Sequence, residues 1–486
     1  MQKSLKTIKI PQTLQAIEKA LNKEGAEALF VGGFVRDTLL GEESKDYDVE
    51  VYGLDSLKQL EVLLRPYGEV NSVGKSFGVV KLHTPHDCYD FSLPRRESKV
   101  AKGHRGFEVI VGEKLSYEEA FIRRDFTMNA LGYRLRDGVL IDCFGGVEDI
   151  THKRLRHIDA DSFVEDPLRV YRGVQFCTRF HLCMVSSTEA LMKQMVKEGA
   201  LEELPKERVF EELKKLLLQS EKPSLGFVLM EKLGVLERYF PELFALIGLP
   251  QSPLYHPEGD VWRHTLLSLD AMVKLLSKAC YEHLSDKERL GFIYAILCHD
   301  LGKATHTTIE EDGRIRSIGH EKAGVEPTRT LLRRLTQEEG WIEKILPLVE
   351  HHLKPSLFFH QGAKAGAIRR LSTKVNIEAL LLLAEADFLG RETPEAKEGV
   401  FEAGEWLKEE AKRLGVLKMP PKPLLQGRDL IALGLKPSKA FKRLLDGVYE
   451  KQLEGKVTTK EEALAWVEAK VLSTPSLSLK ASNSPQ

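Results

Sequence analysis

Residues 29–51 read LFVGGFVRDTLLGEESKDYDVEV, and this stretch decides the architecture of the first part of the chain. The apolar run from Leu29 to Val31 predicts a short buried strand. Gly32 and Gly33 then predict a tight turn with bare backbone N–H groups, followed by a helix over 34–40 that contains Arg36. A turn of bare amides at the start of a helix suits an anion such as a triphosphate.

Two carboxylates follow this helix. Asp46 and Asp48 are two residues apart in DYDVEV, so on a strand both side chains point to one face. Two like charges side by side are unfavourable without a cation between them, and Mg²⁺ prefers carboxylates and substrate phosphates. Two such ions, roughly 3.5–4 Å apart, activate an attacking 3′-hydroxyl and stabilise a departing pyrophosphate. The stretch therefore predicts a magnesium site suited to nucleotidyl transfer.

Each part of this pattern is unremarkable alone, because a Gly-Gly pair is usually a turn and an Asp-x-Asp is usually a solvated strand face. The order strand, Gly-Gly, helix, loop, strand, with Arg36 and Asp37 behind the glycines, favours a functional site. With this order the chain resembles the bacterial class II tRNA nucleotidyltransferase and poly(A) polymerase family, whose first motif is GGxVRDxLLG followed by DxD. The resemblance implies a polymerase-β-like head that binds a nucleoside triphosphate through Gly32, Gly33 and Arg36.

Two further strands are predicted at 76–84 (SFGVVKLHT) and 88–93 (CYDFSL), and Asp90 lies on the second. Polymerase-β-like sites commonly take a third carboxylate from such a strand, but an ordinary exposed strand Asp fits equally well, and both interpretations stay open. The charged segment 94–106 (PRRESKVAKGHRG) predicts a mobile solvated loop. In the resembled family a flexible loop at this position helps the site to change its nucleotide preference.

The segment 123–131 (RRDFTMNAL) predicts a helix start that offers donors to phosphate and an acceptor to ribose hydroxyls. In the resembled family the Arg-Arg-Asp element recognises the ribose. The resemblance therefore implies that Arg124, Asp125 and Asn129 bind the nucleotide.

The segment 165–176 (EDPLRVYRGVQF) predicts a helix with Asp166, Arg169 and Arg172 along one stripe. One interpretation is an intrahelical ion pair worth roughly a few tenths of a kcal/mol. The other is that the planar donors of Arg beside a carboxylate present an edge that pairs with a base. The resemblance supports the second, because the EDxxR element of that family selects CTP and ATP; it implies that Asp166 and Arg169 select the base and that Glu165 and Arg172 assist. The following segment 207–219 has an apolar stripe that predicts core packing.

From residue 250 onward the chain is rich in histidine, and a second set of ligand-type residues appears. Its members are His264, His299, Asp300, His320, His352 and Asp387. The adjacent His-Asp pair, preceded by a His and followed by a distant Asp, resembles the HD superfamily of metal-dependent phosphohydrolases. Imidazole and carboxylate ligands suit a transition metal such as Ni²⁺, Co²⁺ or Mn²⁺ better than Mg²⁺ alone. His256, in HPEGD, is a weaker candidate for the same pocket.

Composition limits the remaining possibilities. The length of 486 residues suits about three domains. With 71 Lys+Arg and 72 Asp+Glu the net charge is -1, so any contact with nucleic acid depends on local basic patches. One such patch is predicted on helical residues 427–456, through Arg428, Lys436, Lys439, Lys442 and Arg443. Six cysteines without CxxC spacing and the lack of a long apolar run predict a reduced cytoplasmic protein with no membrane segment.

These observations predict an α+β fold: a small nucleotidyltransferase head with a mixed sheet, followed by an all-α neck, an HD domain and C-terminal helices. The expected boundaries are 1–150 for the head, 151–248 for the neck with the base-selecting helix, 250–415 for the HD domain, 416–470 for C-terminal helices and 471–486 for a disordered tail. In the resembled family the C-terminal helices hold the elbow region of tRNA.

The predicted function is template-independent addition of CCA to the 3′ end of tRNA from CTP and ATP, by a monomer or a homodimer, with a possible HD phosphodiesterase or phosphatase activity. Two alternatives stay open: addition of A alone or poly(A) synthesis, and an HD phosphohydrolase whose head only binds RNA. The segment 94–106 argues against a CC-only enzyme, and the fused HD residues argue against a poly(A) polymerase. Asp46 and Asp48 argue against a binding-only head.

Overall fold

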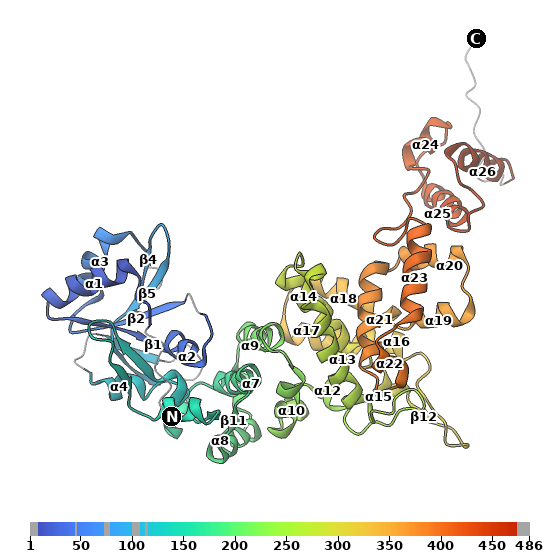
Figure 1. Ribbon diagram of the computed structural model, residues 1–486. Coiled ribbons are helices and arrows are strands. Elements are labelled where there is room, and N and C mark those ends of the chain that lie inside the picture. The colour runs from blue at the N-terminus through green and yellow to red at the C-terminus, as the bar shows by residue number, and fades with distance from the viewer. Residues whose placement is uncertain (1–7, 44–45, 72–77, 100–106, 112–114, 474–486) are drawn as a thin grey trace, which may run out of the picture. The chain divides into compact units, whose positions relative to one another are not determined.

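The computed structural model describes residues 8–43, 46–71, 78–99, 107–111 and 115–473. The chain divides into two compact units, residues 1–240 and 241–486. The first contains the main sheet and the second is built mainly of helices (Figure 1). The predicted mixed sheet followed by helices is confirmed.

A seven-stranded mixed sheet forms the centre of the first unit. Its strand order is β3-β4-β5-β2-β1-β8-β9, and the pairing of β2 with β5 is parallel whereas the other described pairs in this sheet are antiparallel. The strands are β1 (Glu27–Val31), β2 (Tyr47–Tyr52), β3 (Glu69–Asn71), β4 (Val79–His83), β5 (Cys88–Ser92), β8 (Leu131–Arg134) and β9 (Leu140–Asp142). The central position of β1 and β2 explains the apolar run before Gly32, because a central strand is buried on both faces.

Short helices cover this sheet. They are α1 (Gln12–Lys23), α2 (Gly33–Leu40), α3 (Leu57–Leu64), α4 (Tyr117–Phe121) and α5 (Gly146–Thr151). Helix α2 connects β1 to the loop before β2, and Phe34 at its start packs against Phe30 and Tyr47, with ring centroids 4.5 and 5.0 Å away. This aromatic contact holds the start of α2 against the strand that carries Asp48.

The predicted mobile loop at 94–106 is wrong for its first half. Residues Arg95–Lys99 form β6, which pairs with β7 (Phe107–Val111) in a separate antiparallel hairpin. The segment 95–99 has almost no apolar residues, but its partner FEVIV is rich in residues that favour strands. Backbone hydrogen bonds between two strands do not require apolar side chains in both of them. Residues 100–106 lie outside the described part of the chain.

Helices continue the first unit up to residue 240: α6 (Ala160–Val164), α7 (Leu168–Phe180), α8 (Ser186–Lys197), α9 (Lys206–Gln219), α10 (Ser224–Lys232) and α11 (Val235–Tyr239). Helices α7 and α9 pack against each other. Strand β10 (Arg154–Leu155) precedes α7 in the chain and pairs in parallel with β11 (Cys183–Met184), which follows α7. The predicted apolar stripe on α9 is confirmed, since Val209, Leu213, Leu216 and Leu217 are buried.

The second unit is a helical array with one small hairpin, β12 (Thr308–Ile309) and β13 (Ile315–Arg316). Its helices before residue 362 are α12 (Pro241–Phe244), α13 (Val261–Leu276), α14 (Asp286–Cys298), α15 (Lys303–His306), α16 (His320–Ala323), α17 (Val325–Leu335), α18 (Glu339–His351) and α19 (Lys354–Gln361). The later ones are α20 (Ala365–Ser372), α21 (Ile377–Leu389), α22 (Pro394–Glu398), α23 (Glu402–Arg413), α24 (Gly427–Ala432), α25 (Lys439–Leu453) and α26 (Lys460–Leu472). Helices α13, α14, α18 and α21 pack around one another in the interior of this unit.

The last three helices have a core of their own, which includes Leu430, Leu444, Val448 and Val467. All five predicted basic residues of this region are exposed: Arg428, Lys436, Lys439, Lys442 and Arg443. Most of the predicted tail, residues 474–486, lies outside the described part of the chain.

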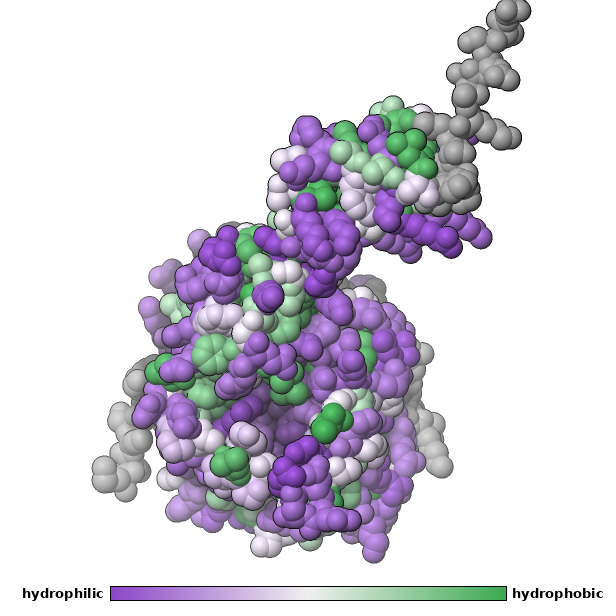
Figure 2. Space-filling model, turned by 90° about the vertical axis from the view of Figure 1, so that its right-hand side faces the viewer, coloured by the Kyte–Doolittle hydropathy of each residue, from purple (hydrophilic) through white to green (hydrophobic). Residues whose placement is uncertain are grey.

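The face in Figure 2 is mostly hydrophilic, with separate small apolar patches. Within the described residues, no helix has both the length and the apolar character that crossing a bilayer requires.

Candidate active sites

A cleft of about 900 Å³ opens in the first unit between the sheet and helix α7. Its lining includes most of the head and neck residues predicted to bind nucleotide: Gly32, Gly33, Arg36, Asp46, Asp48, Arg124, Asp125, Asn129, Asp166, Arg169 and Arg172. Residues separated by up to 140 positions in the sequence therefore face one space. Glu165 is not part of this lining, although it stands next to Asp166.

The glycine turn at the cleft has a steric cause. Gly32 is the N-cap of α2 with φ +65°, and a Cβ added there would lie 2.7 Å from Nη1 of Arg124. Only glycine tolerates both the left-handed backbone and this close approach. The prediction that both glycine N–H groups are bare is wrong for Gly32, whose N–H donates to the carbonyl of Leu131 at 3.1 Å. The open amides at this point are those of the first turn of α2.

Asp46 and Asp48 line the cleft where β2 begins. Asp48 is reached by solvent through the cleft mouth but has protein on most sides, and this partial desolvation, with the negative charges of Asp46 and Asp90, raises its pKa to about 6. Asp90 lies directly opposite Asp48 in the parallel β2–β5 register, and its Oδ2 accepts from Lys81 Nζ at 2.9 Å. Asp90 therefore places a carboxylate beside Asp46 and Asp48, and the ammonium group of Lys81 balances its charge.

Glu50 is an acidic residue of the cleft that sequence reasoning missed. It is 1% exposed; its Oε1 accepts from the Tyr52 hydroxyl at 2.6 Å, and Arg124 lies 3.5 Å from its Oε2. Arg123 lies 3.6 Å from the same oxygen. The period of two that relates Asp46 to Asp48 continues to Glu50, so the strand pattern contained the signal.

A continuous chain of hydrogen bonds joins the predicted nucleotide-binding residues to one another. Arg36 Nη1 donates to Asn129 Oδ1 at 2.7 Å, and Asn129 Nδ2 donates to Asp125 Oδ1 at 2.8 Å. Arg172 on α7 then donates from Nε and Nη2 to Asp125 Oδ2, both at 2.7 Å. Burial acts to raise the pKa of Asp125, but Arg172 and Asn129 outweigh it and hold that pKa below its usual value.

The segment 123–131 is less helical than predicted. Arg123 to Asp125 form a turn after α4, and Thr127–Asn129 make a single 3-10 turn. The backbone N–H of Thr127 donates to the carbonyl of Arg156 instead of entering a helix, and the chain passes directly into β8. This tight path lets the Asp125 side chain accept from its neighbour Phe126 N–H at 2.8 Å.

The guanidinium of Arg36 lies against two aromatic rings of α7. Its guanidinium carbon lies 5.0 Å from the centroids of both Phe176 and Phe180, and its Nε donates to Asp37 at 2.8 Å. Burial lowers the pKa of Arg36, while Asp37 opposes that shift. Arg36 lines the cleft, but its side chain mainly connects α2 to α7.

The prediction that Asp166, Arg169 and Arg172 share one helix is wrong. Helix α7 begins at Leu168, because Pro167 disfavours helical geometry in the residue before it. Asp166 stands ahead of the helix, where its Oδ1 accepts from the Leu168 N–H at 3.2 Å. Arg169 donates to the carbonyls of Ser162 and Arg123 at 2.7 and 2.6 Å, so the intrahelical Asp–Arg pair is absent among the described contacts.

Asp166 is held by a residue that sequence reasoning missed. Arg208 on α9 approaches both of its carboxylate oxygens, at 3.3 and 2.9 Å. The planar fork of an arginine matches a carboxylate in this two-point way. Arg208 is part of the α9 segment that was assigned to core packing alone.

The second unit brings all six predicted HD residues together in its interior. His264 lies near the start of α13, and His299 and Asp300 follow the end of α14. His320 begins α16, His352 caps the end of α18, and Asp387 lies in α21. All six are buried, with at most 6% of each residue exposed.

The nitrogen atoms of the four histidines face two carboxylates. His264 Nε2 lies 3.0 Å from Asp387 Oδ1, and His299 Nε2 lies 3.2 Å from Asp300 Oδ2. His320 Nε2 lies 3.2 Å from the other oxygen of Asp300 and 3.3 Å from His352 Nε2. Asp300 therefore stands at the middle of the cluster, between the pair His264 and His299 and the pair His320 and His352.

Backbone carbonyls determine which nitrogen carries hydrogen in three of these rings. Nδ1 contacts the carbonyl of Ile296 in His299, of Ser317 in His320 and of Val349 in His352, at 2.6 to 2.7 Å. A carbonyl only accepts, so each Nδ1 carries the hydrogen and each Nε2 keeps a lone pair.

The donor set of this cluster fits a metal ion. The Nε2 lone pairs face carboxylate oxygens that also have only lone pairs, and His299 Nε2 makes no hydrogen bond of good geometry within the described residues. Such an arrangement is unfavourable unless a cation or protons lie between the atoms. Mixed nitrogen and oxygen donors of this kind are typical of transition-metal sites.

Charges within the cluster shift its titration. Burial acts to lower the pKa of His299, but Asp300 and Asp387 outweigh it and raise that pKa. Burial, together with the charges of His320 and His299, lowers the pKa of His352 to about 3. Asp300 likewise raises the pKa of His320 against the effect of burial, so the cluster contains two histidines with a raised pKa and one with a lowered pKa.

A pocket of about 170 Å³ adjoins the cluster and is lined by cationic and polar groups, among them Lys303, Arg391 and His256. Lys303 Nζ lies 2.8 Å from Asp300 Oδ2, and Arg391 Nη2 lies 3.3 Å from both oxygens of Asp387. The turn before α15 packs at backbone distance against α16, since a Cβ added at Gly302 would lie 2.0 Å from the carbonyl oxygen of His320. This contact sets the separation of Asp300 from His320.

Family models match three parts of the chain: a poly A polymerase head domain over residues 28–156, a probable RNA and SrmB binding site of polymerase A over 182–247, and an HD domain over 264–390. The first match contains the glycine turn and Asp46 and Asp48. The third begins at His264 and ends just after Asp387, so it spans all six residues of the buried cluster.

Solved structures with the same fold include CCA-adding enzymes. The complex of a CCA-adding enzyme with ATP is 23% identical, with a TM-score of 0.62 over 96% of this chain and 95% of that one. The Thermotoga maritima CCA-adding enzyme complexed with tRNA is 22% identical, with a TM-score of 0.58 over 96% and 97% of the two chains.

Curated relatives are more similar in sequence. The multifunctional CCA protein of Cupriavidus metallidurans is 35% identical over 372 residues, which is 74% of this chain and 84% of that protein. The protein of the same name from Pasteurella multocida is 36% identical over 371 residues, or 74% and 83% of the two chains. With its polymerase-type head and HD domain, the chain belongs to the family of the multifunctional CCA proteins.

Proposed function

We propose that this protein adds CCA to the 3′ end of tRNA, using CTP and ATP without a nucleic-acid template. The observation that carries the proposal is the single cleft in which Asp46 and Asp48 face Asp166 and Arg169. The names of the curated relatives support it, and so do the CCA-adding enzymes of the same fold that were solved with ATP, CTP and tRNA. The proposed tRNA substrate also supports a cytoplasmic location.

Asp46 and Asp48 would hold Mg²⁺, which when bound supplies activation of the 3′-hydroxyl and stabilisation of the pyrophosphate. Asp90 is the candidate for a third carboxylate, but Lys81 would have to release it first. The open amides at the start of α2 and the guanidinium of Arg124 would bind the triphosphate. Through Asn129, Arg36 positions Asp125 for the ribose, and Arg172 holds Asp125 from the other side.

Asp166 and Arg169 would read the base. Each is anchored away from the other, Asp166 by Arg208 and Arg169 by two backbone carbonyls. Anchored side chains present a fixed set of donors and acceptors, and a base that leaves a buried donor unpaired is strongly disfavoured. This arrangement favours CTP and ATP over UTP and GTP.

The test is incorporation of labelled CMP and AMP into tRNA that lacks its 3′ end, by Asp46→Ala and Asp48→Ala variants with Mg²⁺. Both variants are expected to lose incorporation and to keep their affinity for tRNA. Each NTP alone, and CTP with ATP, distinguishes CCA addition from A-only or poly(A) synthesis by the length of the product. Normal incorporation by both variants would contradict the proposal.

We also propose a metal-dependent phosphohydrolase activity for the second unit. The observation that carries it is the convergence of four Nε2 atoms on Asp300 and Asp387 beside a pocket lined by Lys303 and Arg391. His264, His299, Asp300, His320, His352 and Asp387 would hold one or more transition-metal ions, of which Ni²⁺, Co²⁺ and Mn²⁺ match the donors. A bound metal would supply a nucleophile from water at neutral pH, while the cations of the pocket attract a phosphoester.

The exposed basic residues of α24, α25 and the segment between them offer a surface for the tRNA backbone. Such contacts release counterions, so tRNA affinity should fall as salt rises.

A further inference from the structure

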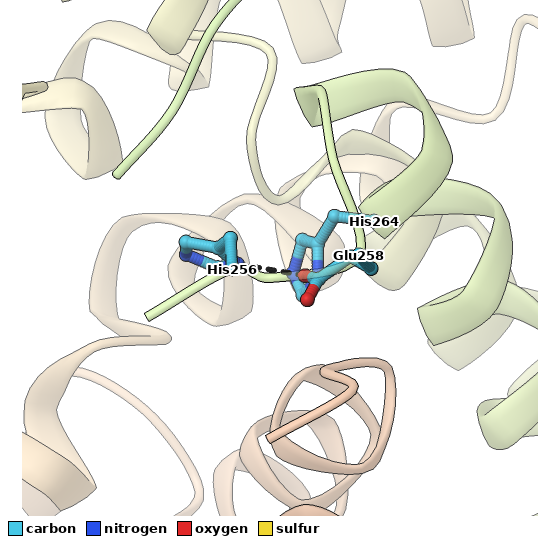
Figure 3. Close-up of side chains that lie close together, drawn as sticks. All are labelled: His256, Glu258 and His264. Carbon is cyan, nitrogen blue, oxygen red and sulfur yellow. Dashed lines mark hydrogen bonds and ion pairs between the residues drawn. The ribbon is translucent and has the colours of Figure 1, made fainter. Parts of the chain in front are cut away.

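The buried cluster is supported by a carboxylate that lies outside the HD set. Glu258 is in the loop before α13, and its side chain is fully buried. Its Oε1 lies 2.8 Å from His264 Nδ1 and 2.9 Å from His256 Nδ1, and Figure 3 shows the carboxylate beside both imidazole rings. Its other oxygen accepts from the backbone N–H of Glu392 at 3.1 Å.

His264 differs from the other three histidines of the cluster in how its ring is held. His299, His320 and His352 each donate Nδ1–H to a carbonyl of the residue three positions earlier. His264 Nδ1 instead faces a charged carboxylate from another part of the backbone. A carboxylate partner fixes the tautomer and also makes the other nitrogen of the ring a stronger metal ligand.

The three residues His256, Glu258 and His264 do not form a separate metal site. His264 Nε2 contacts Asp387 Oδ1 at 3.0 Å within the HD cluster, so an ion at Nε2 together with a second ion at Nδ1 would require a fully deprotonated imidazolate. The 2.9 Å contact of His256 Nδ1 with Glu258 is a hydrogen bond, whereas the 2.8 Å contact of His264 Nδ1 has the distance of one but not its angle. The backbone contact from Glu392 explains why the carboxylate keeps its orientation.

We propose that Glu258 is a positioning residue of the HD centre: when Nε2 of His264 binds a metal, the ring hydrogen lies on Nδ1, and Oε1 of Glu258, 2.8 Å away, accepts it and keeps Nε2 directed toward the metal. His256 donates to the same oxygen and packs edge-on against His264, with ring centroids 4.6 Å apart, so it supports the carboxylate without binding metal. The inference rests on the proposed phosphohydrolase function, because it assigns Glu258 to that centre.

The experiment measures metal affinity of the full-length protein after chelation, with the head carboxylates removed by Asp46→Asn and Asp48→Asn. Mn²⁺ binding is followed by calorimetry, and Co²⁺ binding by its visible absorption, which reports the ligand geometry. Glu258→Ala is expected to weaken binding roughly 10–100-fold, which is the usual effect of removing a partner that orients a ligand. Glu258→Gln should lose less, because its amide oxygen can still accept from His264.

Two controls separate positioning from general damage. Glu242→Gln alters another little-exposed carboxylate of this unit, which pairs with Arg334 at 2.7 Å and lies on α12, and it should leave metal affinity unchanged. His256→Ala should stay within about threefold, since it removes only a second donor to Glu258. Circular dichroism and the thermal midpoint identify any variant that has lost its fold, and Glu258→Gln then remains informative where Glu258→Ala has not folded.

The outcomes are distinct for the two proposals. If the parent binds metal, His264→Ala loses it, and both Glu258 variants bind as the parent does, Glu258 has no positioning role. If the parent binds no ion that His264→Ala removes, the metal-dependent function itself fails and the role of Glu258 fails with it. A larger loss for His256→Ala than for Glu258→Ala would overturn the assignment in favour of His256 as a ligand.

Discussion

Asp48 occupies a place where its protonation competes with metal binding. Partial desolvation and the charges of Asp46 and Asp90 raise its pKa to about 6, so a proton stays on the free carboxylate up to that pH. Because only the charged form binds Mg²⁺, nucleotide addition should rise with pH through about 6 and level off above it. Rates of CMP incorporation across pH, at low and high Mg²⁺, provide the measurement.

The midpoint of that profile should move to lower pH at higher Mg²⁺, since the ion displaces the proton by mass action. A midpoint that ignores Mg²⁺ concentration would assign the titration to another group. A control separates the effect of Mg²⁺ from that of ionic strength. Na⁺ replaces the extra Mg²⁺ at equal ionic strength, and the midpoint of the pH profile should then stay unchanged.

The sequence predicted site residues correctly where the chemistry requires particular residue types that are close together in the sequence. Asp46 and Asp48, and likewise His299 and Asp300, are close in sequence, and each pair does lie in one site. Glu50, Arg208 and Glu258 were missed for different reasons. Glu50 extends the period of two that relates Asp46 to Asp48, whereas Arg208 and Glu258 contact Asp166 and His264 only in the folded chain.

At the scale of elements, α7 is fastened to the head by a buried ion pair. Asp125 is 5% exposed and receives two donors from Arg172. Replacing Arg172 by Met leaves that carboxylate buried without its main partner, so the protein should lose about 3 kcal/mol of its free energy of unfolding. Denaturant unfolding followed by circular dichroism measures this loss.

The matched control for that change is Arg179→Met on the same helix, where the arginine stacks on the Phe180 ring at 4.7 Å. Its effect should be clearly smaller. The double variant Asp125→Asn with Arg172→Met should recover part of the stability, because the uncompensated charge is gone. Equal losses for Arg172→Met and Arg179→Met would show that the pair does not hold α7.

In the proposed base-selecting site, Arg208 of helix α9 holds Asp166. Arg208→Ala removes the two-point contact that holds Asp166, so Asp166 should occupy several positions and discriminate less. Incorporation of UMP relative to CMP should increase roughly tenfold, which corresponds to about 1.4 kcal/mol. The ratio of kcat/KM for UTP and CTP is the quantity to determine.

Lys214→Ala is the control for helix α9, because Lys214 lies on the same helix and pairs loosely with Glu211 at 4.0 Å. It should leave the ratio unchanged. If Arg208→Ala lowers the rates for all nucleotides equally, Arg208 acts on catalysis or folding and not on the choice of base.

Elements were predicted well where periodicity was clear and poorly where a local backbone effect intervened. The strand before Gly32, the helix after it and the apolar stripe of α9 follow from spacing alone. Helix α7 begins later than the ion-pair spacing predicts, because Pro167 disfavours helical geometry at Asp166. Strand β6 was missed because it depends on backbone pairing with β7, which comes later in the sequence. Local propensity does not report such pairing.

At the scale of the whole molecule, the two centres use different chemistry in separate compact units. The first centre has carboxylates without imidazoles, whereas the second combines imidazoles with carboxylates. In the full-length protein, Asp48→Ala should abolish CCA addition and keep phosphoester hydrolysis. His299→Ala should remove hydrolysis of 2′,3′-cyclic nucleotides and leave CCA addition near the wild-type rate.

Hydrolysis should be compared for wild type and both variants with Mg²⁺, Mn²⁺, Co²⁺ and Ni²⁺. Equal hydrolysis by wild type and His299→Ala would place that activity at another site. A loss of CCA addition in a folded His299→Ala protein would mean that the second unit supports the tRNA substrate as well.

The contact between Gly302 and the carbonyl of His320 also limits how this protein can vary over evolutionary time. Every other amino acid adds a carbon atom at position 302, within 2.0 Å of that oxygen as the backbone now stands. A substitution of Gly302 is therefore not neutral, even though Gly302 supplies no ligand atom. It would be tolerated only with a second substitution that moves the turn before α16. The absence of a Cβ at Gly302 therefore limits which substitutions this unit tolerates as much as the imidazoles of the cluster do.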